Sequence, residues 1–154
     1  MSEVRPEELL AATLADQIPD VRHIAVGAAS PIPAAAALLK QARAGTRVHV
    51  TILHSRRYNS FTDGGRELFD AAAQGRIDVF FLGGVQIDGQ ANINLVGLGD
   101  YPNLTQRFPG CFGAPYMAFV VPNVILFREE HSTRTLVKKV DFVSAPGWSP
   151  EGVW

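Results

Sequence analysis

The first half of the chain alternates between segments with a helical pattern and short apolar segments with the composition of strands. Helical patterns cover residues 6–17, 33–45 and 65–75, and strand patterns cover residues 23–27, 46–53 and 76–84. Glycine, or proline followed by aspartate, separates most of these segments, so the connections between them are short. This order predicts an α/β fold with an open, mostly parallel sheet and helices on both faces.

The second half of the chain is less regular. Residues 90–97 alternate like a strand that pairs beside the preceding one, residues 98–115 form a long loop, and residues 122–130 and 138–148 each carry a strand. No internal repeat, low-complexity linker or second domain is visible, so we expect a single domain over residues 1–154. Several strands end in small residues or proline, at the edge where open α/β sheets bind ligands.

Composition narrows the function classes. The net charge is −1 and the basic residues are scattered, which argues against a nucleic-acid-binding surface. A single cysteine, Cys111, rules out an internal disulfide framework and fits a reducing compartment. No signal peptide is visible and no apolar run approaches the roughly 20 residues that span a bilayer, so we expect a soluble, cytoplasmic protein. His23 and His131 lack partners at metal-ligand spacing, so we expect no metal site.

The segment FFLGGVQIDGQANIN, residues 80–94, is rich in glycine and in amide side chains. A surface turn needs one glycine and an aspartate or asparagine. Here Gly83, Gly84 and Gly89 lie close together and Asn92 and Asn94 follow. This composition indicates a backbone that approaches another group closely.

Three later segments carry a common pattern, namely GGVQIDGQANINLVGLGDY (83–101), TQRFPGCFGAP (105–115) and KVDFVSAPGW (139–148). In this order they resemble the β subunit of the family I CoA-transferases, closest to the glutaconate CoA-transferase type. The resemblance implies an α-like partner subunit in a hetero-oligomer, or else a homo-oligomer. It also implies an active site at the subunit interface, where an acyl-CoA thioester binds, with coenzyme A as part of the substrate and no bound cofactor. Family β subunits continue beyond the P-G-W segment, so the fold is expected to be C-terminally short here.

The sequence departs from the pattern of this family at the catalytic position. In this family a glutamate at the end of a β-subunit strand attacks the thioester and then carries CoA as a glutamyl thioester. The matching strand is VHVTILHS (48–55), which places Thr51 where the glutamate belongs. No glutamate occurs between Glu8 and Glu67. Because a threonine cannot form a carboxylic anhydride, the sequence predicts that this subunit lacks the catalytic glutamate of the family.

Three interpretations follow from this departure. The first is a subunit of a CoA-transferase-like enzyme whose chemistry has drifted to acyl-CoA hydrolysis or ring opening, with the acidic residue on the partner subunit. The second is a true CoA-transferase whose nucleophile comes from the partner. The third is a non-catalytic subunit that binds the CoA substrate or supports its partner. We favour the first.

Candidate site residues follow from the same comparison. The loop RFPGCFGAP (107–115) resembles the glycine loop of the family, whose backbone N–H groups suit a thioester oxyanion. Beside Thr51, which matches the catalytic position, His54 is a candidate acid–base group. We interpret Cys111 as a small buried side chain and His49 as a packed, hydrogen-bonded histidine. The residues predicted to bind the substrate or CoA are Gly83, Gly84, Gln86, Asp100, Gly110, Phe112, Gly113 and Ala114.

Overall fold

The computed structural model of the chain describes residues 4–148, which divide into two compact units. The first unit holds the residues up to 81 together with residues 120–125, and the second holds residues 82–119 and the chain from residue 126 on. The polypeptide therefore passes from one unit to the other after residues 81, 119 and 125. Our expectation of a single domain over residues 1–154 stays a prediction.

The first unit is built on a four-stranded sheet with the strand order β2-β1-β3-β8. The strands are β1 (His23–Val26), β2 (His49–Ile52), β3 (Val79–Leu82) and β8 (Asn123–Leu126). β1 pairs in parallel with both β2 and β3. The helices are α1 (Pro6–Gln17), α2 (Pro31–Ala44) and α3 (Gly64–Ala73), and a short 3-10 helix, η1 (Gly45–Arg47), precedes β2.

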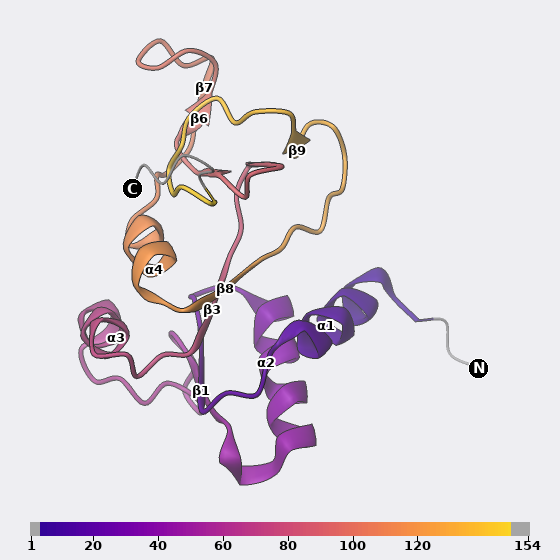
Figure 1. Cartoon of the computed structure of the whole chain (residues 1–154), viewed down its shortest axis with the longest axis vertical. Coiled ribbons are helices and arrows are strands. Elements are labelled where there is room, and N and C mark those ends of the chain that lie inside the picture. The colour runs from indigo at the N-terminus through magenta and orange to yellow at the C-terminus, as the bar shows by residue number, and fades with distance from the viewer. Residues whose placement is uncertain (1–3, 149–154) are drawn as a thin grey trace. The chain divides into compact units, whose positions relative to one another are not determined.

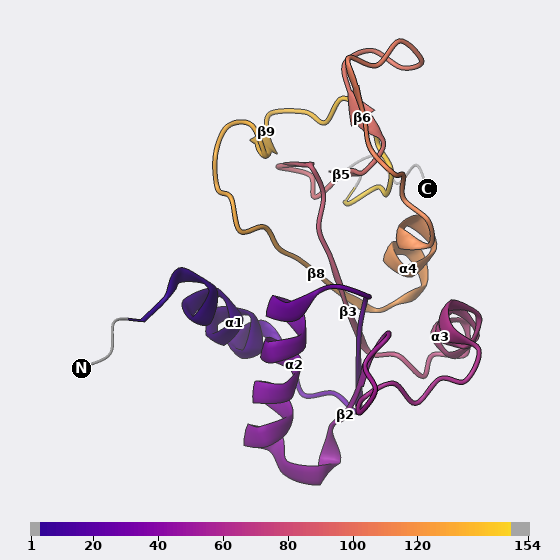
Figure 2. The same cartoon turned by 180° about the vertical axis from the view of Figure 1, so that it is seen from behind.

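Helices cover both faces of this sheet. α1 and α2 lie on one side of the strands and α3 lies on the other, as the two opposite views show (Figures 1 and 2). Since strand side chains alternate between the faces, Ile24 and Val26 of β1 pack on one face while His23 and Ala25 point to the other. The predicted α/β fold, with an open, mostly parallel sheet and helices on both faces, is confirmed.

The second unit contains two small sheets and a short helix. One sheet has the order β5-β4-β9, with β4 (Gln86–Asp88) antiparallel to β5 (Ile93–Asn94) and parallel to β9 (Leu136–Val137). The other sheet is an antiparallel hairpin of β6 (Gly97–Leu98) and β7 (Gln106–Arg107). Helix α4 (Ala114–Val120) follows the hairpin. The segment 98–115, which we predicted as a long loop, thus contains β7, one of the two strands of this hairpin.

The strand predicted over residues 90–97 does not pair with the preceding strand of the large sheet. Within it, Ile93–Asn94 forms a short strand that pairs with β4 in the separate sheet of the second unit. The reason lies at Gly84, where a Cβ atom would lie 2.7 Å from the backbone oxygen of Gln86. The backbone is crowded at this glycine, which lies between the end of β3 and the start of β4 in the new sheet.

The prediction of a strand within residues 138–148 is wrong, because this segment forms no regular strand. The pairing of this segment is an isolated bridge, between Ala145 and Ile93. Side chains take up its backbone N–H groups: Asp141 N donates to Gln86 Oε1 at 2.9 Å, and Gly147 N donates to Asn92 Oδ1 at 3.0 Å. A backbone whose donors are bound by side chains has no regular ladder to join.

Candidate active site

Thr51, the residue that we predicted to match the catalytic position, is fully buried in the first unit. Thr51 lies on β2 and has no exposed surface. Its Oγ1 atom lies 2.9 Å from Nε2 of His23, 3.2 Å from Nε2 of His49 and 3.1 Å from Oγ of Ser60. His23 and His49 occupy paired positions of the parallel strands β1 and β2, with ring centroids 4.5 Å apart. We call these four residues the Thr51 network.

The tautomer of His23 fixes the direction of the hydrogen bonds in the Thr51 network. Nδ1 of His23 lies 3.0 Å from the carbonyl oxygen of Arg76, which can only accept, so Nδ1 carries a hydrogen. Burial, and secondarily the neighbouring His49, lowers the pKa of His23 to about 4, so the ring is neutral near pH 7. Its Nε2 atom is therefore an acceptor, and we assign the Thr51 hydroxyl as the donor to it. The Thr51 oxygen then accepts from His49 and Ser60, which fills its hydrogen-bonding capacity.

This arrangement resembles a nucleophile beside a base, but its electrostatics favour a structural role. A general base works best when its pKa lies near the working pH, and a histidine with a pKa of about 4 is a weak base. Three filled hydrogen bonds on a buried hydroxyl are what a well-packed polar interior requires. As a catalytic residue, Thr51 stays a prediction.

A cavity of about 440 Å³ adjoins the Thr51 network in the first unit. His23 and Ser60 line it, together with Glu67 and Asp70 of α3. The Glu67 carboxylate accepts a hydrogen bond from the backbone N–H of Asp63 at 2.7 Å and so caps the start of α3. This carboxylate of the cavity wall is thus engaged at the helix end rather than with Thr51.

His54 stands apart from the Thr51 network. It lies in the turn that follows β2, with its side chain exposed and a backbone φ of +64°. A positive φ is uncommon for a residue with a side chain and marks a tight turn. His54 therefore has the exposure that an acid–base group needs, and its predicted catalytic role stays a prediction.

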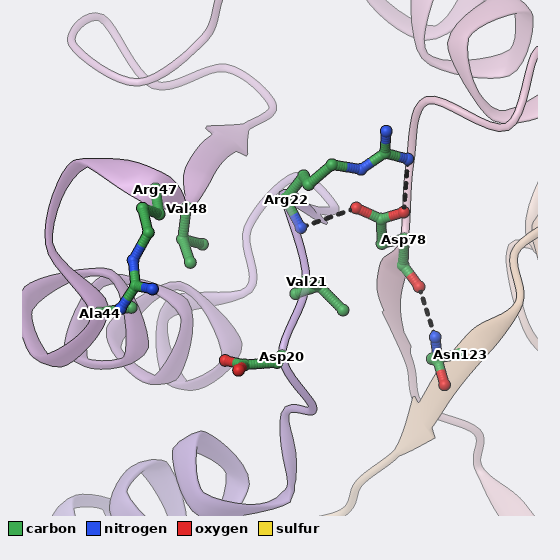
Figure 3. A pocket seen from close by; sticks show the side chains of 8 residues that line it. All are labelled: Asp20, Val21, Arg22, Ala44, Arg47, Val48, Asp78 and Asn123. Carbon is green, nitrogen blue, oxygen red and sulfur yellow. Dashed lines mark hydrogen bonds and ion pairs between the residues drawn. The ribbon is translucent and has the colours of Figure 1, made fainter.

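A second cavity of the first unit, of about 520 Å³, lies where strands begin (Figure 3). Arg22 precedes β1 and Asp78 precedes β3. The backbone N–H of Arg22 donates to Asp78 Oδ2 at 2.9 Å, and its guanidinium lies 3.4 Å from Oδ1. Asn123 Nδ2 donates to the backbone oxygen of Asp78 at 3.0 Å. Because these polar groups satisfy one another and lie at the edge opposite to the usual ligand edge, we interpret this cavity as structural.

The glycine-rich segment that opens the second unit brings several predicted site residues together. Gly83 approaches Phe127 so closely that a Cβ atom would lie 3.3 Å from its backbone oxygen. The buried Gln86 side chain accepts through Oε1 from Asn94 Nδ2 at 2.8 Å and from Asp141 N at 2.9 Å. The groups that the glycine and amide residues approach are thus parts of their own unit. Gln86 as a substrate-binding residue stays a prediction.

Asp88 organises this segment, and sequence reasoning did not select it. Its carboxylate accepts from the backbone N–H groups of Gln90 and Asn92 at 3.0 and 3.1 Å and from the Asn92 amide at 3.1 Å. It also accepts from Val140 N at 3.4 Å. Burial raises the pKa of Asp88, but these hydrogen bonds outweigh burial and hold the pKa below its usual value. The aspartate directly before a glycine was the available signal of a turn that binds its own backbone.

The residues of the glycine loop differ in exposure and in whether their backbone groups are already hydrogen-bonded. Gly110 is exposed with a φ of +105°, and the side chain of Phe112 is 91% exposed. Ala114 N donates to the Cys111 oxygen at 2.8 Å, so this N–H is already engaged inside the loop. Gly113 contributes its oxygen to the first turn of α4 through Met117 N, at 2.9 Å. The Cys111 side chain is half-buried, short of the buried position that we expected.

The predicted site residues are distributed over both units. Thr51 and His54 belong to the first unit, and the remaining eight belong to the second. Asp100 is exposed beside Tyr101, whose ring lies 5.2 Å from that of Phe142. Within residues 4–148, no group of three or more His, Cys, Asp or Glu side chains could hold a metal ion. No helix in the same range is both long and apolar enough to cross a membrane.

The fold is that of an α/β protein, a class in which ligands usually bind beyond the carboxyl ends of the parallel strands. The profile of the family described as Coenzyme A transferase matches residues 51–153, about two thirds of the chain. The chain therefore belongs to the coenzyme A transferase family.

Relatives and solved structures agree with this assignment. The chain is 41% identical over 78 residues to the β subunit of 3-oxoadipate CoA-transferase from Pseudomonas knackmussii, covering 51% of this chain and 30% of that protein. It is 37% identical over 70 residues to the β subunit of glutaconate CoA-transferase from Acidaminococcus fermentans, covering 46% and 26%. The matched segments thus span less than a third of either relative. In fold the chain is similar to the decarboxylase AibA/AibB, with a TM-score of 0.82 and 24% identity over 94% of this chain and 68% of that one.

Proposed function

We propose that this chain is the β subunit of an enzyme that acts on an acyl-CoA thioester together with an α-like partner subunit. Family membership supports this proposal, as do the two relatives that are named as β subunits of CoA-transferases. The exposed Phe112 and Phe119, on and after the glycine loop, are the kind of aromatic side chains that subunit interfaces bury.

The observation that carries the choice of reaction is the Thr51 network. Transfer of CoA through this subunit requires a carboxylate that forms an anhydride and then a thioester. Thr51 supplies a hydroxyl instead, and that hydroxyl is engaged with His23, His49 and Ser60. We therefore propose hydrolysis, either of the thioester or of a carbon–carbon bond in a ring of the acyl group, with the acidic group on the partner. A decarboxylase of similar fold supports the view that this fold is not restricted to CoA transfer.

The two forms of hydrolysis differ in their products. Thioester hydrolysis adds water to the acyl carbon and releases a carboxylic acid and the free CoA thiol. Ring opening adds water across the carbon–carbon bond and leaves CoA attached to the product. In both cases the backbone N–H groups around Gly110 and Gly113 would stabilise the oxyanion that forms when a carbonyl is attacked.

The experiment is to express the chain with its α-like partner and to incubate the complex with several acyl-CoAs, with and without acetate. Products are followed by mass spectrometry. The proposal predicts free CoA, or an acyl-CoA heavier by one water, whether or not acetate is present. Formation of acetyl-CoA would contradict it and favour a transferase whose nucleophile lies on the partner. Activity of the partner alone, unchanged by this chain, would favour a non-catalytic role.

A further inference from the structure

The second unit contains a cavity of about 200 Å³ that none of the residues discussed above explains. Its walls include the apolar side chains of Val85, Leu98 and Phe108 and the two arginines Arg128 and Arg134. A site for a whole drug-sized ligand usually has a volume of about 300–1,000 Å³. This cavity therefore suits a single charged group on a short chain better than a complete CoA molecule.

Arg128 is the unusual member of this wall. Its Nε atom is buried and has no hydrogen-bond partner among residues 4–148. A buried N–H of a charged group that lacks an acceptor is unfavourable, so native proteins rarely leave one without a function. The residue itself lines the cavity, so the rest of its guanidinium is the part that a ligand in the cavity would contact.

The other charges at the cavity are already paired. Arg134 donates to the Glu130 carboxylate through Nε at 3.1 Å and through Nη2 at 2.7 Å, and Ser132 donates to the same carboxylate at 2.5 Å. The hydrogen bonds from Arg134 and Ser132 lower the pKa of Glu130 to about 2, so Glu130 stays ionised near pH 7. Glu130 forms its ion pair with Arg134 and also feels the charge of Arg128. Because the lining holds two arginines and this one carboxylate, one positive charge is left in excess at the cavity.

We propose that this cavity binds an oxyanion carried by the acyl-CoA substrate, with the Arg128 guanidinium as its charge partner. The inference rests on the proposed function for the identity of the molecule that carries the oxyanion. A guanidinium binds carboxylate and phosphate through the same planar set of N–H donors. The oxyanion is thus either a phosphate of CoA or a carboxylate at the far end of the acyl group.

Binding measurements distinguish these two sources. Titration calorimetry on the chain in complex with its partner would compare CoA with dephospho-CoA, and glutaryl-CoA with valeryl-CoA, which has the same chain length but no terminal carboxylate. If the cavity binds the 3′-phosphate of CoA, Arg128→Gln weakens the binding of CoA by about tenfold or more and leaves the binding of dephospho-CoA unchanged. If it binds the diphosphate, the variant weakens the binding of both molecules. If it binds a carboxylate, the same variant removes the preference for glutaryl-CoA over valeryl-CoA.

Two further variants test the charge argument. Glu130→Gln removes the competing carboxylate and should strengthen binding of the oxyanion, opposite in sign to Arg128→Gln. Lys138→Gln removes one positive charge from an exposed position of the same unit and should change none of these affinities. Equal affinities for Arg128→Gln and Lys138→Gln, or weaker binding by Glu130→Gln, would overturn the proposal.

The inference and the proposed function can fail separately. Inorganic phosphate and acetate are titrated into the complex with the partner subunit, formed either with the wild-type chain or with its Arg128→Gln variant. If the variant no longer binds phosphate or acetate and the complex turns over no acyl-CoA, the oxyanion site is supported and the proposed function is contradicted. The opposite result is turnover of an acyl-CoA together with no effect of Arg128→Gln on the binding of phosphate, acetate or acyl-CoA. That result would support the proposed function and contradict the oxyanion site.

Discussion

The Thr51 hydroxyl lies 2.9 Å from Nε2 of His23, across the parallel pair of strands β1 and β2 in the first unit. The hydroxyl donates, because the other ring nitrogen of His23 donates to the Arg76 carbonyl. At the position where our prediction places the reactive carboxylate of the family, this chain has a hydroxyl that is hydrogen-bonded by its neighbours. The central claim about function depends on this relationship.

Replacing Thr51 by valine keeps the shape of the side chain and removes the hydroxyl. His23 Nε2 and the Ser60 hydroxyl would lose a buried partner, so we expect Thr51→Val to lower the free energy of unfolding by about 1–3 kcal/mol. Thr51→Ser, which keeps the hydroxyl, should cost less. Urea denaturation at pH 7 measures both. Equal stability of the valine variant and the wild type would show that the network contributes nothing.

The low pKa of His23 predicts a dependence of stability on pH. Burial first, and then His49, lowers this pKa from 6.5 to about 4, so the unfolded chain binds a proton more readily than the folded chain. The stability that neutral His23 contributes is therefore complete above pH 6.5 and is lost as the pH falls towards 4. His23→Gln should flatten this part of the profile. Unfolding free energies at pH 7 and pH 5 would measure it, and an unchanged difference in the variant would contradict the assignment.

Gly84 tests the close approach in the glycine-rich segment. A methyl group there would lie 2.7 Å from the Gln86 oxygen and 3.2 Å from the Asn94 oxygen, both backbone atoms that cannot move aside easily. We expect Gly84→Ala to destabilise the protein by about 1–3 kcal/mol. Gly89→Ala is the matched control, because nothing lies within 4 Å of the added atom. Thermal unfolding compares the two, and similar losses would argue against a steric cause.

Gln86 tests whether the amide residues hold the second unit together. Gln86→Met removes the oxygen that accepts from Asn94 and from the Asp141 backbone, so we expect a loss of about 1–3 kcal/mol. Gln90→Met, at an exposed position of the same segment, should change stability by less than about 0.5 kcal/mol. Hydrogen exchange of the Asp141 amide gives a local measurement. Protection of that amide unchanged in Gln86→Met would contradict the assigned bond.

The first unit could be predicted from the sequence because its signals are local. Apolar periodicity and the glycine and proline boundaries lie within each segment, and the helices and strands were found close to their predicted positions. The second unit could not be predicted in the same way. Its segments are held by bonds between side chain and backbone over long separations, such as Gln86 to Asp141 and Asn92 to Gly147, which leave no periodic pattern.

The surroundings of Thr51 could not be predicted from the sequence. The family pattern singled out Thr51, but its partners come from other segments, and only the pairing of β1 with β2 brings His23 beside it. Ser60 reaches it from a loop that has no secondary-structure signal. Arg128 gave no signal in sequence, because its property is a buried atom without a partner among the residues that the structure describes.

The most direct test follows two labels in one reaction. The complex with the α-like partner is incubated with an acyl-CoA in water labelled with heavy oxygen, in the presence of deuterated acetate, and the products are separated and weighed by mass spectrometry. The account predicts that heavy oxygen enters the free acid or the ring-opened acyl-CoA and that no deuterated acetyl-CoA forms. Deuterated acetyl-CoA, with no heavy oxygen taken from water into the acyl product, would contradict it and identify a CoA-transferase.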